Sequence, residues 1–320
     1  MSMKKIEVSK LLPVIMLIVL IVIGSQLSES FFTLSNLSNI VQYAVESAFI
    51  GIGMTFVLLI GGIDLSVGSV LAFASVVSAK MALESMSIPL ILIVVILIGL
   101  GCGAVNGLLV TRFRIEPFMA TLAMMMIMRA CTFLFTGGGP LTGSVQDSFK
   151  QIIKGDFLGV QNGIWYVLIA FVAAFLILDR TRFGRHIYAV GGGEETAKLF
   201  GVQTDRVKLC AYMISGLLAA LSGLFIAARI GIGEPRSGQS YEMTAITICV
   251  VGGISMLGGK GNILGTFVGT MVVCMISNLM NLMNIDTNAQ PIVTGIIILV
   301  TTLIVSREVG KSRKHLVKEI

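Results

Sequence analysis

Residues 88–110, IPLILIVVILIGLGCGAVNGLLV, contain no charged side chain, and the charge-free stretch extends from Glu84 to Arg112. A helix of about 20 residues crosses the roughly 30 Å of hydrocarbon in a bilayer, so this stretch is long enough to span a membrane. Its apolar residues do not alternate with polar ones as they would in a barrel strand. Gly103 and Gly107 form a small-xxx-small pattern, which is typical of membrane helices that pack closely.

The composition of the whole chain is also typical of a membrane protein. Apolar residues make up 55% of the 320 residues and charged residues only 12%, with a mean hydropathy of +0.95. Soluble domains carry about 25% charged residues. We therefore expect an all-α, polytopic membrane protein, a single transmembrane domain over residues 1–320. The predicted spans lie near 11–28, 37–60, 65–84, 88–110, 117–136, 163–179, 208–229, 241–258, 263–284 and 289–306.

The Lys and Arg residues indicate the orientation. With the N-terminus in the cytoplasm, the inside segments hold most of the 23 basic residues, as the positive-inside rule requires. An even number of spans then places both termini in the cytoplasm, with an inside loop at 180–207 and an extracytoplasmic loop at 137–162. The net charge of +6 reflects this bias, so we expect a lipid bilayer around the chain and no nucleic-acid partner.

The inside loop contains a predicted short helix, from Glu194 to Phe200, that ends at Gly201. Acidic residues suit the start of a helix and glycine suits its end. So short a helix is unstable alone, and we expect it to dock on a partner. An ordinary solvated loop is the alternative.

This helix has a small apolar face. Ala197 and Phe200 lie three residues apart on one face, with Leu199 adjacent, and give a small apolar surface for a docking partner to bury. Glu194, Glu195 and Lys198 are expected to remain in water.

No motif for catalysis, metal binding or nucleotide binding is found. The only histidines are His186 and His315, and all five cysteines lie in predicted spans without metal or redox spacing. In the sequence 253–261, GISMLGGKG, five residues separate the first glycine from the Gly-Lys pair, and a glycine follows that pair. A phosphate-binding loop has four residues between its first glycine and its Gly-Lys pair, and Ser or Thr follows the pair. We therefore expect no enzyme activity, no metal and no cofactor in this chain, and any ATP would be used by a partner subunit.

Polar residues inside the predicted spans are the candidates for function, because burying them in lipid is costly. We expect Asn106, Arg129, Asn278 and Asn281 to line a solute pathway. Asn278 and Asn281 lie three residues apart and so share one helix face. Hydrogen bonds between helices, and an Arg129 that extends to the membrane interface, are the alternatives.

Residues 61–69, GGIDLSVGS, join two predicted spans. The Asp64 carboxylate is expected to cap the following helix by accepting a hydrogen bond at Ser66 or Val67, with an ion site as the alternative. The tetrapeptide at 252–255, GGIS, resembles GGID at 61–64 and hints at an internal repeat.

Four stretches, in order along nearly the whole chain, resemble the permease subunits of bacterial ABC importers for simple sugars. They are 61–69, with Gly61, Gly62, Asp64, Ser66 and Gly68 as its structural motif; 114–122, leading to Arg129; 182–192, leading to Gly201; and 252–261. The sequence departs from the family pattern at Glu194, where the family usually has Asn, and at Thr244, where it usually has an acid. The second departure leaves the sugar open.

The resemblance implies the fold of the vitamin B12 importer permease, with ten helices, in the bacterial inner membrane. It also implies partners: a second permease copy, as a homodimer or with a paralogue, cytoplasmic ATPase subunits and an extracytoplasmic sugar-binding protein. Residues 194–202 would be the coupling helix that contacts the ATPase. The contact residues implied are Gly184, Arg185, Glu194, Glu195, Ala197, Leu199, Phe200 and Gly201.

We therefore expect the membrane-spanning subunit of an ATP-driven importer for a monosaccharide, ribose or a related pentose or hexose. One alternative is a permease of the same superfamily for a nucleoside, autoinducer-2 or a branched-chain amino acid. The other is an ion-coupled secondary transporter, for which Asp64 or Glu46 would have to serve as the coupling carboxylate.

Overall fold

The computed structural model describes residues 8–286, 289, 291–293, 295–297 and 299. Within them the chain is almost entirely α-helical. The only sheet in this part is a hairpin of β1 (Asp156–Phe157) and β2 (Val160–Gln161). The expected all-α fold is therefore confirmed.

In the described part of the chain, six helical segments are long and apolar enough to cross a membrane. They are α2 (Leu34–Leu59), α4 (Ile88–Thr111), α5 (Pro117–Thr136), Asn162–Arg180, α10 (Thr204–Ile230) and α12 (Ile263–Leu282). The segment Asn162–Arg180 consists of α7 (Asn162–Phe175) and a π-helical turn, η1 (Leu176–Arg180). Three more helices have shorter apolar stretches: α1 (Val8–Leu27), α3 (Val67–Leu83) and α11 (Tyr241–Val251). The protein is thus a multi-pass membrane protein.

Each predicted span up to 263–284 coincides with one of these helices, and the last, 289–306, lies mostly outside the described residues. One prediction was too long. The span 241–258 was expected to be continuous, but α11 ends at Val251 because Gly253, with φ of +81°, turns the chain out of the helix.

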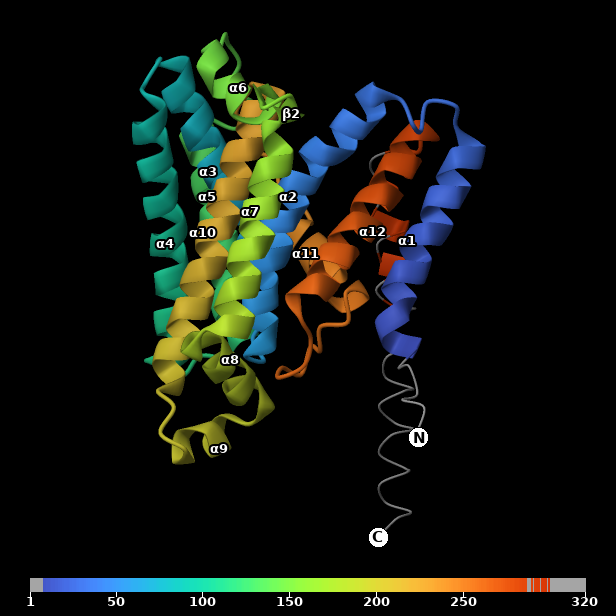
Figure 1. Cartoon of the computed structure of the whole chain (residues 1–320). Helices are drawn as coiled ribbons and strands as arrows, with labels where there is room; N and C mark the ends of the chain where they lie inside the picture. Colours follow the sequence, from blue (N-terminus) through green and yellow to red (C-terminus); the bar gives the residue numbers. More distant parts are fainter. Residues whose placement is uncertain (1–7, 287–288, 290, 294, 298, 300–320) are drawn as a thin grey trace.

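The two ends of the helix bundle carry the short elements (Figure 1). At one end lie α6 (Asp147–Lys154) and the hairpin, and at the other lie α8 (Arg182–Gly192) and α9 (Glu194–Leu199). We call these the α6 end and the α9 end. Helix α8 was not predicted; the Thr181 hydroxyl caps it by accepting a hydrogen bond of 3.1 Å from the Gly184 amide.

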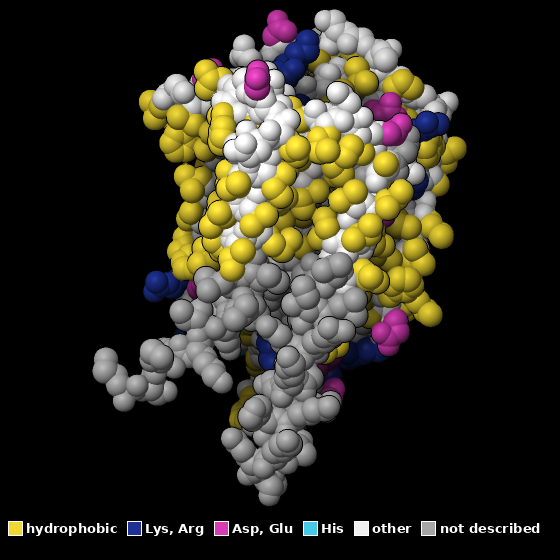
Figure 2. All heavy atoms as spheres, turned by 90° about the vertical axis from the view of Figure 1, so that its right-hand side faces the viewer, with side chains coloured by type: hydrophobic (Ala, Val, Ile, Leu, Met, Phe, Trp, Pro, Cys, Tyr) yellow, Lys and Arg dark blue, Asp and Glu magenta, His cyan; other side chains and the backbone are white. Residues whose placement is uncertain are grey.

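Hydrophobic side chains cover the middle of the face seen in Figure 2, while charged side chains gather above and below them. Many large apolar residues are exposed along the helices, among them Ile93, Leu97 and Ile169. This belt between two charged ends is the surface that a lipid bilayer stabilises.

Helix α10 lies at the centre of the bundle, against α2, α3 and α4. Glycines allow the closest approach: a Cβ atom on Gly103 of α4 would overlap the Tyr212 carbonyl oxygen, and one on Gly216 of α10 would overlap the Gly99 carbonyl oxygen. Backbones this close gain van der Waals contact, which drives helix association in lipid.

This packing predicts that Gly103→Val destabilises the purified protein by about 1–3 kcal/mol, as is typical of overpacking. Gly101→Val is the matched control, because Gly101 lies on the exposed face of the same helix, with no atom within 4 Å of the position that a Cβ atom would take. Thermal denaturation in detergent measures both variants. Equal midpoints for the two variants would show that the α4–α10 contact is not tight.

Candidate functional site

A hydrogen-bond network surrounds the buried Asp64 between α2 and α3. Its carboxylate accepts hydrogen bonds from the Ser66 amide at 3.0 Å, the Ser66 hydroxyl at 2.6 Å and the Ser215 hydroxyl at 2.7 Å. Asn106 of α4 donates to the Ser66 hydroxyl at 2.8 Å. The predicted hydrogen bond from Ser66 to Asp64 is therefore present, and the network also joins α4 and α10.

Glycines complete the 61–68 segment. Gly61, with φ of +78°, ends α2, and its amide donates to the Leu58 carbonyl at 2.9 Å. Gly253 ends α11 in the same way, donating to Val250 at 3.0 Å. Gly62 lies against the Tyr212 hydroxyl and Gly68 against the Gly238 carbonyl. The similar tetrapeptides at 61–64 and 252–255 thus both end a helix with the same kind of turn. The left-handed glycine is the first residue of the tetrapeptide in one case, Gly61, and the second in the other, Gly253.

Arg129, on α5, binds backbone carbonyl groups. Its guanidinium donates to Pro235 and Ser237 at 2.9 Å each, in the loop before α11, and to Gly68 at 3.4 Å. It also lines a cavity of about 430 Å³ with Phe133, Arg236 and Gln239.

Asn278 and Asn281 line a second cavity of about 280 Å³ between α2, α10 and α12, which we call the α2–α12 cavity. It lies toward the α6 end, between the first turns of α2 and the last turns of α12 (Figure 1). The structure thus brings together two of the four residues predicted for a solute pathway. Asn106 and Arg129 lie elsewhere, and the pathway role of all four stays a prediction.

An ion pair adjoins this cavity. Arg229 of α10 lines the cavity, and its guanidinium binds the fully buried Glu46 carboxylate through Nε and, at 3.2 Å, through Nη2. The Tyr241 hydroxyl also donates to Glu46, at 3.4 Å. Arg229 was not among the predicted site residues. The sequence feature that could have indicated this pair was Glu46 within the predicted span 37–60, together with Arg229 at the end of the predicted span 208–229.

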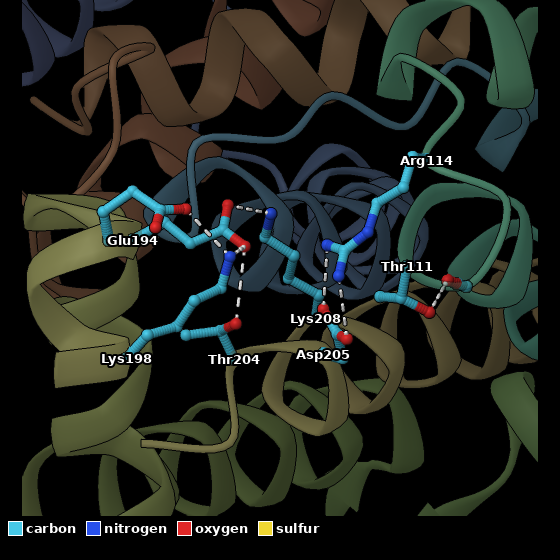
Figure 3. Close-up of polar contacts among 9 residues, drawn as sticks. Thr111, Arg114, Glu194, Lys198, Thr204, Asp205 and Lys208 are labelled. Carbon is cyan, nitrogen blue, oxygen red and sulfur yellow. Dashed lines mark hydrogen bonds and ion pairs between the residues drawn. The ribbon is translucent and has the colours of Figure 1, made fainter. Parts of the chain in front are cut away.

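The α8–α9 segment is held to α10 by charged side chains (Figure 3). Glu194, at the start of α9, receives hydrogen bonds from Lys208 of α10, from Thr204 at 3.4 Å and from Lys198, whose ammonium nitrogen lies 3.1 Å away. Beside them Arg114 forms a bidentate pair with Asp205, at 3.1 and 3.2 Å.

The structure corrects the expectations for α9 at Glu194 and Ala197. Glu194 was expected to remain in water, but it is paired with lysines and its side chain is only 28% exposed. Ala197 was expected to share with Phe200 and Leu199 an apolar face that a partner buries. Phe200 and Leu199 are 84% and 87% exposed and so are accessible to a partner, whereas Ala197 is already buried within the chain.

Helix α8 joins this segment to the rest of the bundle. Gly184 is buried against the Leu178 carbonyl, whereas Arg185 is exposed. The Tyr188 hydroxyl donates to the Gly261 carbonyl at 3.1 Å. Gly191 lies against the Leu59 carbonyl and the Gly259 amide, which are themselves hydrogen-bonded at 2.9 Å. We call this meeting of α2, α8 and the 252–262 loop the glycine junction.

A permease family matches the chain. The model of the family described as "Branched-chain amino acid transport system / permease component" matches residues 36–302. The chain belongs to this family. It is therefore a transport permease rather than an enzyme, and the resemblance seen in the four sequence stretches is confirmed.

Its curated relatives include sugar permeases. The ribose import permease of Haemophilus influenzae is 40% identical over 292 residues, which cover 90% of each chain. That of Bacillus subtilis is 39% identical over 296 residues, or 92% of each chain. The L-arabinose permease of Azospirillum brasilense is 33% identical over 85% of this chain and 80% of its own. No solved structure matches significantly.

The α9 geometry predicts that Glu194→Gln loosens the segment, because a neutral amide binds Lys208 and Lys198 more weakly than a carboxylate does. A spin label at Leu199→Cys, with the native cysteines replaced, reports mobility by electron paramagnetic resonance. Glu195→Gln is the matched control, since the Glu195 side chain is 86% exposed and, among the residues that the structure describes, binds only Lys198. Equal mobility in both variants would contradict this anchoring role.

Acidification should reproduce the effect of Glu194→Gln. Burial alone would raise the pKa of Glu194, but hydrogen bonds from Lys208 and Lys198 outweigh it and lower the pKa. A lowered pKa means that the attachment is complete at neutral pH and is lost as the pH falls through the pKa of the docked carboxyl. The label should therefore become mobile in acid, with no further change in Glu194→Gln.

Proposed function

We propose that this protein is the membrane-spanning permease subunit of an ATP-driven importer for a monosaccharide, ribose or a related pentose or hexose, in a bacterial inner membrane. The observation that carries the proposal is the match, at 40% identity over nine-tenths of the chain, to ribose import permeases. Permeases named for D-allose and fructose match at 32% and 33% identity. Relatives for several sugars support the solute class more firmly than any one sugar.

The proposal includes ten membrane helices in the fold of the vitamin B12 importer permease, with both termini and the α8–α9 segment in the cytoplasm. The basic residues at the α9 end, such as Arg112, Arg206 and Lys208, support this orientation. A second permease copy and an extracytoplasmic sugar-binding protein would complete the transport pathway.

ATP hydrolysis is assigned to a separate ATPase subunit, which would dock on α9. The absence of a phosphate-binding loop in the sequence supports this assignment. The exposed Leu199 and Phe200 support the docking site, because two large apolar side chains in water gain stability when a partner covers them.

A branched-chain amino acid is the second candidate solute, because the family description names it. Relatives named for ribose, L-arabinose, D-allose and fructose favour a sugar. Against an ion-coupled transporter, Asp64 and Glu46 are both engaged by protein donors.

Uptake by cells tests the proposal. Cells that lack their own sugar importers would express the chain together with a candidate ATPase subunit and a candidate sugar-binding protein from the same organism. We expect them to accumulate labelled ribose or another sugar from a pentose and hexose panel, and not leucine. Accumulation of leucine without any sugar would overturn the proposed solute class.

Phe200→Asp tests the docking site. If Phe200 is buried by the ATPase, losing its side chain costs about 3–5 kcal/mol, so ATPase association should weaken by about 100-fold or more. Sugar uptake and stimulated ATP hydrolysis should fall together, in pull-down, transport and phosphate-release assays. Membrane insertion should persist, because Phe200 is exposed and outside the spanning helices.

Leu158→Asp is the matched control for this substitution. Leu158 is also a large exposed apolar residue, at 79%, but it lies in the hairpin at the opposite end of the bundle. It should leave ATPase association unchanged. Normal uptake by a well-expressed Phe200→Asp variant would show that α9 is not the coupling element.

A further inference from the structure

The α2–α12 cavity has an unusually polar lining for a space between membrane helices. It lies between three helices, α2, α10 and α12, and opens to the surface at Asn39 and Asn281, which are both exposed. Only Ile40, Cys274 and Leu282 contribute apolar side chains. The polar lining residues are Asn36, Asn39, Gln42, Tyr43, Arg229, Ser277, Asn278 and Asn281.

Two of these residues fix the walls. Asn36 of α2 and Asn278 of α12 bind each other through both amides, at 3.1 and 2.7 Å, and Asn36 also donates to the Phe31 carbonyl at 2.8 Å. This reciprocal pair connects α2 to α12 beside the cavity. It preorganises the space, so that binding there costs little ordering of the walls.

Other groups retain hydrogen-bonding capacity. Among the described residues, the Asn39 side chain has no hydrogen-bond partner. The Nε and Nη2 atoms of Arg229 donate hydrogen bonds to Glu46. Its Nη1 atom has no partner among the described residues. Gln42 donates one amide hydrogen to Ser38 at 3.1 Å, and its carbonyl oxygen accepts none there.

The charge balance selects the ligand class. Glu46 neutralises Arg229, so the cavity offers no net charge to hold an anion or a cation. Amide groups both donate and accept hydrogen bonds, and so does every hydroxyl of a sugar. The lining therefore matches a neutral solute that carries several hydroxyl groups.

We propose that the α2–α12 cavity is a binding site for the transported polyhydroxylated solute within a single permease subunit, with Asn39, Gln42, Arg229 and Asn281 as its binding residues. This inference rests on the proposed function. With the α6 end outside the cell, the site lies on the side where a binding protein delivers solute.

Transport and ATP hydrolysis, measured in parallel, test the site. The complete importer, in vesicles with its binding protein and ATPase, is assayed with labelled ribose, or with the sugar that cells import best. The double variant Asn39→Leu/Asn281→Leu removes two amides while retaining similar volume. Two lost hydrogen bonds to the solute are expected to reduce uptake by about ten-fold.

The control is Ser35→Leu, an exposed polar residue on α2 that does not line the cavity. It should transport normally. Hydrolysis stimulated by the loaded binding protein should stay near the wild-type rate in the double variant, because the α9 end is untouched. A merely structural role for the two amides would lower hydrolysis and uptake together.

Three outcomes are distinguishable. Uptake that falls while stimulated hydrolysis persists supports the site. Normal uptake by the double variant, or a parallel fall in uptake and hydrolysis, overturns it while leaving the proposed function intact. If the wild-type importer transports no sugar in the panel, the proposed function fails, and this inference fails with it.

Discussion

A polar group inside a bilayer has no water to bind, so it must find its partner within the protein. Two carboxylates in this chain show how that constraint organises the bundle. Asp64 is satisfied by the hydroxyls of Ser66 and Ser215, and Glu46 by the guanidinium of Arg229. In each case one partner, Ser215 or Arg229, belongs to α10. Separating α10 from α2 would leave a charge unpaired in an apolar surrounding, which costs about 3–5 kcal/mol for a buried ion pair.

The central position of α10 follows from small residues as well as from these polar bonds. Gly216 and Gly223 lie against the backbones of α4 and α3, close enough that no side chain fits between. The same helix carries Lys208 at the α9 end and Arg229 beside the α2–α12 cavity. One continuous helix, held on several sides, thus connects the segment proposed to contact the ATPase with the cavity proposed to hold the solute.

The sequence predicted those structural features whose residues lie close together along the chain. Membrane spans follow from charge-free stretches, because the bilayer thickness fixes their length. The Asp64–Ser66 bond was predictable because its partners are two residues apart. The pairs Asn36–Asn278 and Glu46–Arg229 join residues separated by 242 and 183 positions, and no local pattern links them. The burial of Ala197 within the chain likewise depends on how α9 packs on α8 and α10, which helical spacing alone does not fix.

The glycine junction shows why the two candidate sites are not independent. Leu59, at the α9 end of α2, and Gly259, just before α12, are hydrogen-bonded to each other, and Gly191 of α8 lies against both. At their other ends α2 and α12 form the walls of the cavity, fixed by Asn36 and Asn278. Each wall is therefore held at two points, one beside the cavity and one against α8. A side chain at Gly191 would have to displace the Leu59 carbonyl and the Gly259 amide, so the close fit of α8 depends on a residue without a Cβ atom.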